Sequence, residues 1–154
     1  MSPALIAAAS PGHRFLAAAR LEHHRLAFTR RSIRSGSGVA DVVPEIGAEV
    51  WGALYELHDD RIEALDLKEG VGFAYERSAV VVRAAQGEEL TAFAYTVISR
   101  DAMEVAPSLE YLRGIVEGAE ARSLPESYLA SLRALAARWH GQPTALSPGA
   151  RSDA

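Results

Sequence analysis

The sequence predicts an α+β fold, because strand-like segments fill most of its first two thirds and amphipathic helical segments fill its last third. This order is typical of a mainly antiparallel sheet or open β-barrel with flanking helices. The length of 154 residues is that of one domain. We therefore expect one domain over residues 1–141 and a disordered tail over residues 142–154, which are rich in Pro, Ser, Gly and Ala.

The first part of the chain is expected to form a short helix and then four strands. Ser2 followed by Pro3 is typical of a helix start, and Pro11 with Gly12 breaks the chain after it. Apolar and β-branched residues then predict strands at 15–21 and 25–29, joined around residues 22–24, and at 39–43 and 49–57, separated by a turn at residues 44–47.

The second part is expected to contain three helices and two more strands. Asp59 or Asp60 can cap a short helix that stops at Glu69, because Gly70 is the residue type most common just beyond a helix end. Strands follow at 75–83 and 90–98. Ser108 can cap a helix that runs to residue 118, and a last helix is expected at 125–139.

Composition excludes several function classes. The chain has no cysteine, which rules out disulfides, thiolate nucleophiles and cysteine-ligated zinc. A net charge of -4 argues against nucleic acid and anionic membranes as partners, and no apolar run approaches the ~20 residues of a membrane span. His23 and His24 are neighbours, so in a strand they point to opposite faces and no metal site is expected there. A cytoplasmic protein is the simplest interpretation.

Seven short segments occur in a fixed order in this sequence. They are Gly38–Pro44 (GVADVVP), Glu49–Leu57 (EVWGALYEL), Leu65–Val71 (LDLKEGV, followed by Tyr75), Ala94-Tyr95, Pro107–Leu112 (PSLEYL), Gly118-Ala119 and Leu124–Tyr128 (LPESY). In sequence and order they resemble the γ-glutamyl cyclotransferase family, including its plant and bacterial relatives. The resemblance extends from about Met1 to Leu135.

The resemblance implies a reaction that needs neither a metal nor a cofactor. The α-amine of a γ-glutamyl amine or γ-glutamyl amino acid attacks its own γ-carbonyl, which gives 5-oxoproline and releases the amine. Ring closure needs no enzyme nucleophile, only a group that moves protons. Glu69 matches the family's catalytic glutamate, and we expect it to be partly buried beside an enclosed pocket. An isolated Glu-Gly pair would instead be interpreted as a solvated helix end.

The resemblance also suggests which residues hold the small-molecule substrate. Tyr95 matches a substrate-contacting tyrosine, and Tyr75 and Tyr111 match other tyrosine positions of the family. Gly36 and Gly38 match a glycine-rich loop near the site. Each tyrosine is equally compatible with ring packing, and the glycines with loop flexibility alone.

Two further features of the sequence are candidates for the site. Arg30, Arg31 and Arg34 suit an anionic substrate tail, although a loop of arginines is more often a solvated cluster. Asp66 lies three residues before Glu69 and is either a second carboxylate of the site or a charge on the helix surface. The predicted catalytic set does not include Asp66.

One departure from the family bears on activity. Its members open with a strand that ends in a Tyr-Gly-Ser-Asn loop, and this sequence resembles the segment that follows the loop. We expect the first strand to be missing, which leaves open a catalytically silent member that binds a γ-glutamyl-like metabolite or serves as a scaffold. The resemblance is compatible with a homodimer, and the released amine is not identified by the sequence.

Overall fold

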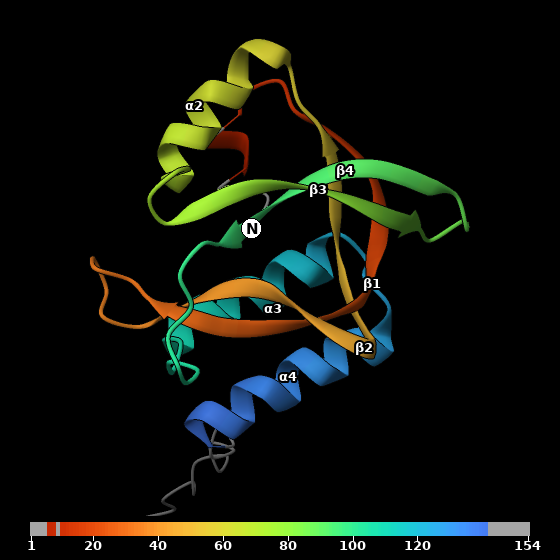
Figure 1. Cartoon of the computed structure of the whole chain (residues 1–154). Coiled ribbons are helices and arrows are strands. Elements are labelled where there is room, and N and C mark those ends of the chain that lie inside the picture. The colour runs from red at the N-terminus through yellow and green to blue at the C-terminus, as the bar shows by residue number, and fades with distance from the viewer. Residues whose placement is uncertain (1–5, 9, 142–154) are drawn as a thin grey trace, which may run out of the picture.

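The computed structural model describes residues 6–8 and 10–141. It contains a four-stranded antiparallel sheet and the three helices that are labelled in Figure 1. The predicted α+β class is confirmed, and the sheet is not closed into a barrel. The strands follow the order β2-β1-β3-β4. Their bounds are Arg14–Arg31 (β1), Gly38–Glu56 (β2), Tyr75–Ala84 (β3) and Glu89–Val97 (β4), and those of the helices are Asp59–Glu69 (α2), Leu109–Ala121 (α3) and Glu126–His140 (α4).

The first two strands form one long hairpin with a bend in the middle. We predicted four separate strands here, and that prediction is wrong, because pairing continues on both sides of the irregularity. Glu22 pairs with Glu49 and His24 pairs with Pro44, so residues 45–48 of β2 loop out opposite His23. His23 has a positive φ of 58°, which bends β1 at this point. The hairpin therefore turns a corner and runs below β3 and β4 (Figure 1).

The two halves of the sheet meet at a short seam. β1 and β3 pair at Ala19↔Ala84 and Arg20↔Arg83, and no further ladder pair joins these two strands over their described lengths. β3 and β4, by contrast, pair from Tyr75↔Val97 through Arg83↔Glu89. The sheet is therefore two hairpins joined at one corner, and another interaction has to hold the opposite end.

Asp41 supplies that interaction. It is 2% exposed, and its carboxylate accepts hydrogen bonds from the Thr29 hydroxyl (2.8 Å), the Val97 backbone N–H (3.1 Å) and Arg100 Nε (2.7 Å). These donors come from β1, from the end of β4 and from the segment after it. A buried charge is tolerated because it is paired and hydrogen-bonded in this way.

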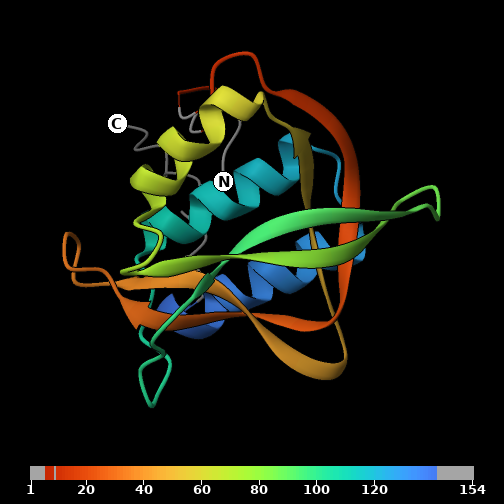
Figure 2. The same ribbon diagram turned by 45° about the horizontal axis from the view of Figure 1, so that its top comes forward.

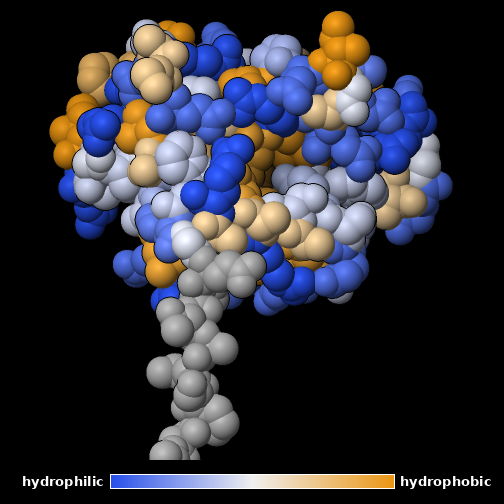
Figure 3. Space-filling view, turned by 90° about the horizontal axis from the view of Figure 1, so that it is seen from below, coloured by the Kyte–Doolittle hydropathy of each residue, from blue (hydrophilic) through white to orange (hydrophobic). Residues whose placement is uncertain are grey.

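The helices lie on both sides of the sheet. Figure 1 shows α2 at one end of the molecule and α4 at the other, and Figure 2 shows α3 crossing behind the strands. Leu129 and Leu132 of α4 and Ala119 of α3 form the main buried cluster with Leu124, and Trp51 of β2 packs against it. Seen from below, the surface is mostly hydrophilic, with hydrophobic side chains gathered in a recess near its middle (Figure 3).

The helix ends test the predicted caps. The Ser108 hydroxyl accepts a hydrogen bond from the Tyr111 backbone N–H at 3.1 Å, as predicted, although α3 runs on to Ala121. The predicted cap of α2 is wrong. Its N-cap is His58, which makes no side-chain cap, and Asp59 and Asp60 lie in the first turn, where their charges favour the helix dipole. Residues 6–8 are helical. The rest of the predicted N-terminal helix and the predicted tail lie outside the described residues.

Gly38 allows the close approach of β2 to the segment after β4. Its backbone N–H donates to the Ala106 carbonyl at 2.8 Å, and a Cβ built at this position would lie 2.0 Å from the Val105 carbonyl oxygen. Backbone atoms cannot move aside as a flexible side chain can. The position therefore requires glycine.

We predict that Gly38→Ala lowers the free energy of unfolding by at least about 1–3 kcal/mol, the usual cost of forcing atoms into a filled space. Gly52→Ala is the matched control, since it also lies in β2 and its added Cβ would meet nothing within 4 Å. Urea denaturation of both variants measures the difference. Equal stability of the two would contradict the tight contact.

We also predict that Asp41→Ala destabilises the fold by about 3 kcal/mol, the lower end of the cost of removing one partner of a buried ion pair, because Arg100 can still reach water. Thr29→Val removes one of the three hydrogen bonds and should cost about 1 kcal/mol. Denaturant unfolding of each variant checks this order. A smaller loss for Asp41→Ala than for Thr29→Val would contradict it.

Candidate functional site

Glu69 is the last residue of α2, and its place is set by the turn that ends the helix. Gly70 is left-handed, with φ 74° and ψ 46°. The Gly70 N–H donates to the Leu67 carbonyl (3.2 Å) and the Val71 N–H to the Asp66 carbonyl (2.9 Å). This is the Schellman arrangement that closes a helix on a glycine. The side chain of Glu69 is therefore held on a rigid helix end rather than on a loop.

The loop after Glu69 is short and internally bonded. The Gly70 carbonyl accepts from the N–H groups of Phe73 (3.1 Å), Ala74 (2.8 Å) and Tyr75 (3.3 Å). The Gly72 N–H donates in turn to the Tyr75 carbonyl at 2.9 Å. As a result, Tyr75 at the start of β3 is fixed close to the end of α2.

Two tyrosines meet at one peptide unit of β2. The Ala40 N–H donates to the Tyr111 hydroxyl oxygen at 3.2 Å, and the Tyr75 hydroxyl lies 3.5 Å from the Ala40 carbonyl, a long hydrogen bond. β2, β3 and α3 thus converge at Ala40. Its neighbour Asp41 ties the same stretch of β2 to the end of β4.

The third tyrosine is fixed by Asp66. The Tyr95 hydroxyl donates to Asp66 Oδ1 at 2.7 Å, and Arg77 Nη1 donates to Asp66 Oδ2 at 2.9 Å. Asp66 therefore anchors β3 and β4 to α2 and keeps Tyr95 in place. Both carboxylate oxygens of Asp66 accept hydrogen bonds, so Asp66 positions Tyr95 and Arg77 and is more than a charge on the helix surface.

The phenol groups are kept in their neutral form. Burial is the largest cause that raises the pKa of Tyr75 to about 12, and electrostatic interactions with Tyr111, Glu69 and Asp41 add to it. Burial, then the hydrogen bond to Asp66, raises the pKa of Tyr95, and burial also raises the pKa of Tyr111. The negative charge of Glu69 contributes to all three shifts. Glu69 thus lies within electrostatic reach of each of the predicted substrate-binding tyrosines.

Glu69 itself is half-buried and uncommitted. It makes no ion pair and no side-chain hydrogen bond with any residue that the structure describes, whereas Asp41 and Asp66 each hold an arginine. The expected partial burial is therefore confirmed. A carboxylate that no neighbouring cation neutralises is available to accept a proton.

The two predicted glycines lie outside this cluster. Gly36 is exposed in the turn between β1 and β2, with φ 69°, and its carbonyl accepts from Arg31 at 2.6 Å. Gly38 packs against the backbone of Val105. Their visible contacts are those of a turn and of close packing, and their part in substrate binding stays a prediction.

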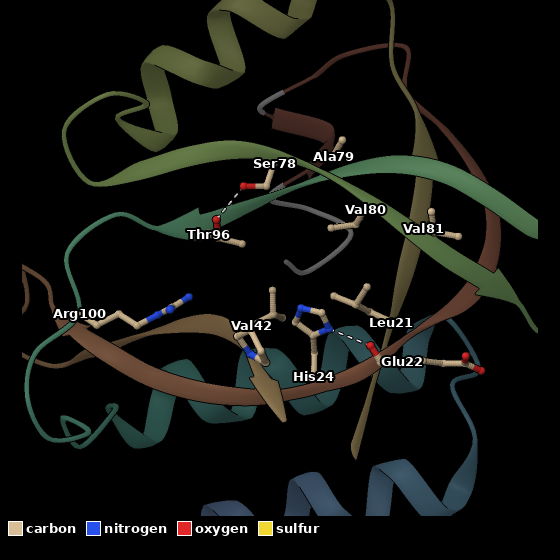
Figure 4. Close-up of a pocket in the computed structure, with 11 residues that line it drawn as sticks. Leu21, Glu22, His24, Val42, Ser78, Ala79, Val80, Val81, Thr96 and Arg100 are labelled. Carbon is tan, nitrogen blue, oxygen red and sulfur yellow. Dashed lines mark hydrogen bonds between the residues drawn. The ribbon is translucent and has the colours of Figure 1, made fainter. Parts of the chain in front are cut away.

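A slot lies between the two sheet halves. It has a volume of about 430 Å³, with Leu21 and His24 of β1 on one side and Val80 of β3 and Thr96 of β4 on the other (Figure 4). A second pocket, of about 230 Å³, lies around His58. Neither is lined by Glu69 or the three tyrosines, so the enclosed pocket expected beside Glu69 is not one of them.

Two kinds of site are not found in the described part of the chain. No helix there is both long and apolar enough to cross a membrane. No group of three His, Asp or Glu side chains comes together there as metal ligands would.

Comparison with known proteins decides the family. Residues 49–132, more than half of the chain, match the AIG2-like family. This chain belongs to the AIG2-like family. The chain is 30% identical over 131 residues to a mouse protein named gamma-glutamylcyclotransferase, a match that covers 82% of this chain and 69% of the mouse protein.

Further relatives agree with this assignment. A human protein of the same name is 28% identical over a segment of the same length and coverage. A solved structure named gamma-glutamyl cyclotransferase superposes with a TM-score of 0.81 at 28% identity, covering 86% of this chain and 80% of that one. This chain is therefore a member of the cyclotransferase family in both sequence and fold.

Sequence reasoning missed the parts of the site that hold the tyrosines. Asp66 and the Ala40 peptide position Tyr95, Tyr75 and Tyr111, but only the packing of β3, β4 and α3 shows it. One signal was present, because Asp66 and Glu69 are three residues apart and so share a helix face.

We predict that stability falls as the pH rises from about 10 to 12. The unfolded chain loses tyrosine protons near pH 10, whereas the folded state holds the Tyr75 proton to about pH 12, so the stabilisation is complete below pH 10 and is lost above it. Urea denaturation between pH 8 and 11 measures this, and Tyr75→Phe should flatten the decline. An unfolding free energy that stays constant from pH 9 to 11 would refute the shift.

Proposed function

We propose that this protein is a γ-glutamyl cyclotransferase in which Glu69 moves the protons. The observation that carries the proposal is the half-buried carboxylate of Glu69, which has no partner in the described chain. It is held on a rigid helix end, and its charge influences the pKa of three neutral tyrosines. Membership in a family with relatives named for this activity supports it.

The proposed reaction balances without water, oxidant or metal. Glu69 accepts a proton from the substrate's α-ammonium, and the freed amine attacks the γ-carbonyl carbon. A carbon–nitrogen bond forms within a five-membered ring, and the amide bond to the leaving group then breaks. Glu69 returns its proton to the leaving nitrogen. The ring nitrogen still carries one proton too many and gives it up through the same carboxylate to the departing amine, so the products are 5-oxoproline and the amine in its protonated form. Holding the amine close to the carbonyl supplies much of the acceleration.

The tyrosines suit the other requirement of this reaction. A carbonyl oxygen gains negative charge when the amine adds to it, and a neutral phenol can donate a hydrogen bond to such an oxygen. Tyr75, Tyr95 and Tyr111 keep their protons well above neutral pH. The protons of Tyr95 and Tyr75 are directed at Asp66 and at the Ala40 carbonyl, whereas the Tyr111 oxygen accepts from Ala40, so Tyr111 is the phenol of the three that suits donation to such an oxygen. We assign them to substrate binding, with Tyr95 as the first candidate for direct contact.

We predict that Glu69→Gln lowers kcat/KM for 5-oxoproline release at least about 100-fold, because general acid–base catalysis contributes about 10²–10⁴-fold. The amide keeps the shape of the side chain and cannot carry the proton. Product is measured by chromatography with a γ-glutamyl dipeptide as substrate. Glu63→Gln, an exposed position on the same helix, is the control and should keep full activity.

The outcome for folded Glu69→Gln decides the assignment. Circular dichroism and the melting temperature show whether the variant folds. Unchanged turnover by a folded Glu69→Gln protein would remove Glu69 from the mechanism. Loss of activity in Glu63→Gln as well would show that activity depends on the structure of helix α2 rather than on the Glu69 carboxylate.

A second candidate is a silent member that binds a γ-glutamyl-like metabolite without converting it. The observation that favours it is the slot between the two sheet halves, which has room for a small molecule and is not lined by Glu69 or the three tyrosines. Calorimetric binding without 5-oxoproline release would support this candidate. Release of 5-oxoproline from the bound compound would support the enzyme.

A further inference from the structure

The slot between the two sheet halves has one edge of β3 along its upper wall (Figure 4). Backbone groups of a strand point alternately to its two sides, and hydrogen bonds at the end of β3 fix which residues point where. The Ala85 N–H donates to the Ala18 carbonyl at 2.9 Å, so odd-numbered residues direct their backbone groups toward β1. The Ala84 N–H donates to the Glu88 carbonyl at 2.8 Å, so even-numbered residues direct theirs toward β4.

Three residues of β3 therefore present open backbone groups to the slot. The N–H and carbonyl groups of Arg77, Ala79 and Val81 point toward β1, but they make no backbone hydrogen bond with any residue that the structure describes. An open strand edge of this kind binds an added strand through main-chain hydrogen bonds. At about 3.4 Å per residue, residues 77–81 span about 14 Å, the length of four or five residues of an extended chain.

The opposite wall offers side chains more than backbone groups. The Glu22 carbonyl of β1 already accepts a hydrogen bond from His24 Nδ1 at 2.8 Å, and Figure 4 shows the His24 ring standing in the slot. Leu21 and Val42 add apolar surface on this side, across from Val80. An extended chain in the slot would thus be hydrogen-bonded to β3 and packed by its side chains against β1 and β2.

Both ends of the slot are closed, which limits the length of what it can hold. At one end Arg20 pairs with Arg83, and at the other Asp41 binds the Val97 N–H and Arg100 Nε. Arg100 lines the slot at this second end, and its two Nη atoms make no hydrogen bond within the described chain. These Nη groups can therefore receive the carboxylate of a ligand.

The direction of the ligand follows from the position of Arg100. β3 begins at that end of the slot, because its first residue Tyr75 pairs with Val97. A chain that runs antiparallel to β3 ends there, with its C-terminal carboxylate beside Arg100. We propose that the slot binds a free peptide of about four or five residues, extended and antiparallel to β3. This site does not include Glu69 and does not depend on the proposed function.

Calorimetric titration of the full chain with the peptide acetyl-Ala-Val-Thr-Val-Ala, which has a free carboxylate, tests the site. Ala79→Pro removes one N–H that faces the slot, and a proline is tolerated at an open strand edge. We expect this variant to bind about 10-fold more weakly, the effect of one lost hydrogen bond. Ala79→Ser keeps the N–H and should keep the affinity. Equal affinity of the two variants, or no binding by the unchanged protein at about 1 mM peptide, would overturn the proposal.

Amide hydrogen exchange of the unchanged protein gives a second readout that does not depend on a variant folding. Without peptide, the amides of Arg77, Ala79 and Val81 should exchange faster than those of Ser78 and Val80, which face β4. Saturating peptide should slow the first group at least about 10-fold and leave the second unchanged. Binding without this protection would place the peptide elsewhere and overturn the site.

Two further ligands separate this proposal from the proposed function. The same peptide with a C-terminal amide should bind about 10-fold more weakly, since it has lost the charge that Arg100 receives, and equal affinity would overturn the orientation. γ-Glutamyl-alanine should not displace the peptide, because the proposed reaction takes place beside Glu69. Displacement would assign the slot to a γ-glutamyl compound and overturn the peptide site. Release of 5-oxoproline is measured separately and bears on the proposed function alone.

Discussion

The site depends on one buried carboxylate, that of Asp41. The sheet consists of two hairpins, and β1 and β3 join them at one corner through two residue pairs. At the opposite end, Asp41 of β2 accepts hydrogen bonds from Thr29, Val97 and Arg100 and so connects both hairpins. Burying this charge is unfavourable unless all its partners are present, so the end of the sheet that carries the tyrosines forms as a unit.

The same constraint shapes the chemistry around Glu69. Ala40, next to Asp41, presents both groups of its peptide unit to the hydroxyls of Tyr75 and Tyr111. Two carboxylates lie near these phenols, and only one of them, Asp41, is neutralised by an arginine within the described chain. Neutral phenols near a carboxylate that has no ion-pair partner in the described chain suit the proton transfer that we propose for Glu69.

The sequence was sufficient to predict the fold class, the Ser108 cap and the end of α2 at Glu69, because each depends on local periodicity and on residues with strong positional preferences. It failed where two distant segments decide the outcome. The bend at His23 looked like a break in the chain, but pairing with β2 continues across it. The sequence alone does not decide the role of Asp66, since its partners Tyr95 and Arg77 come from strands that lie elsewhere in the sequence.

The turn at Gly70 has a consequence for how this protein can vary. One carbonyl collects three backbone donors, so the number of residues between α2 and β3 is set by backbone bonding rather than by side chains. Adding or deleting a residue there would rotate Tyr75, the first residue of β3, away from the helix end and would separate its hydroxyl from the Glu69 carboxylate. Changes of side-chain type at the exposed Phe73 leave that spacing intact, so the surface of this turn can vary while Glu69 and Tyr75 keep their relative positions.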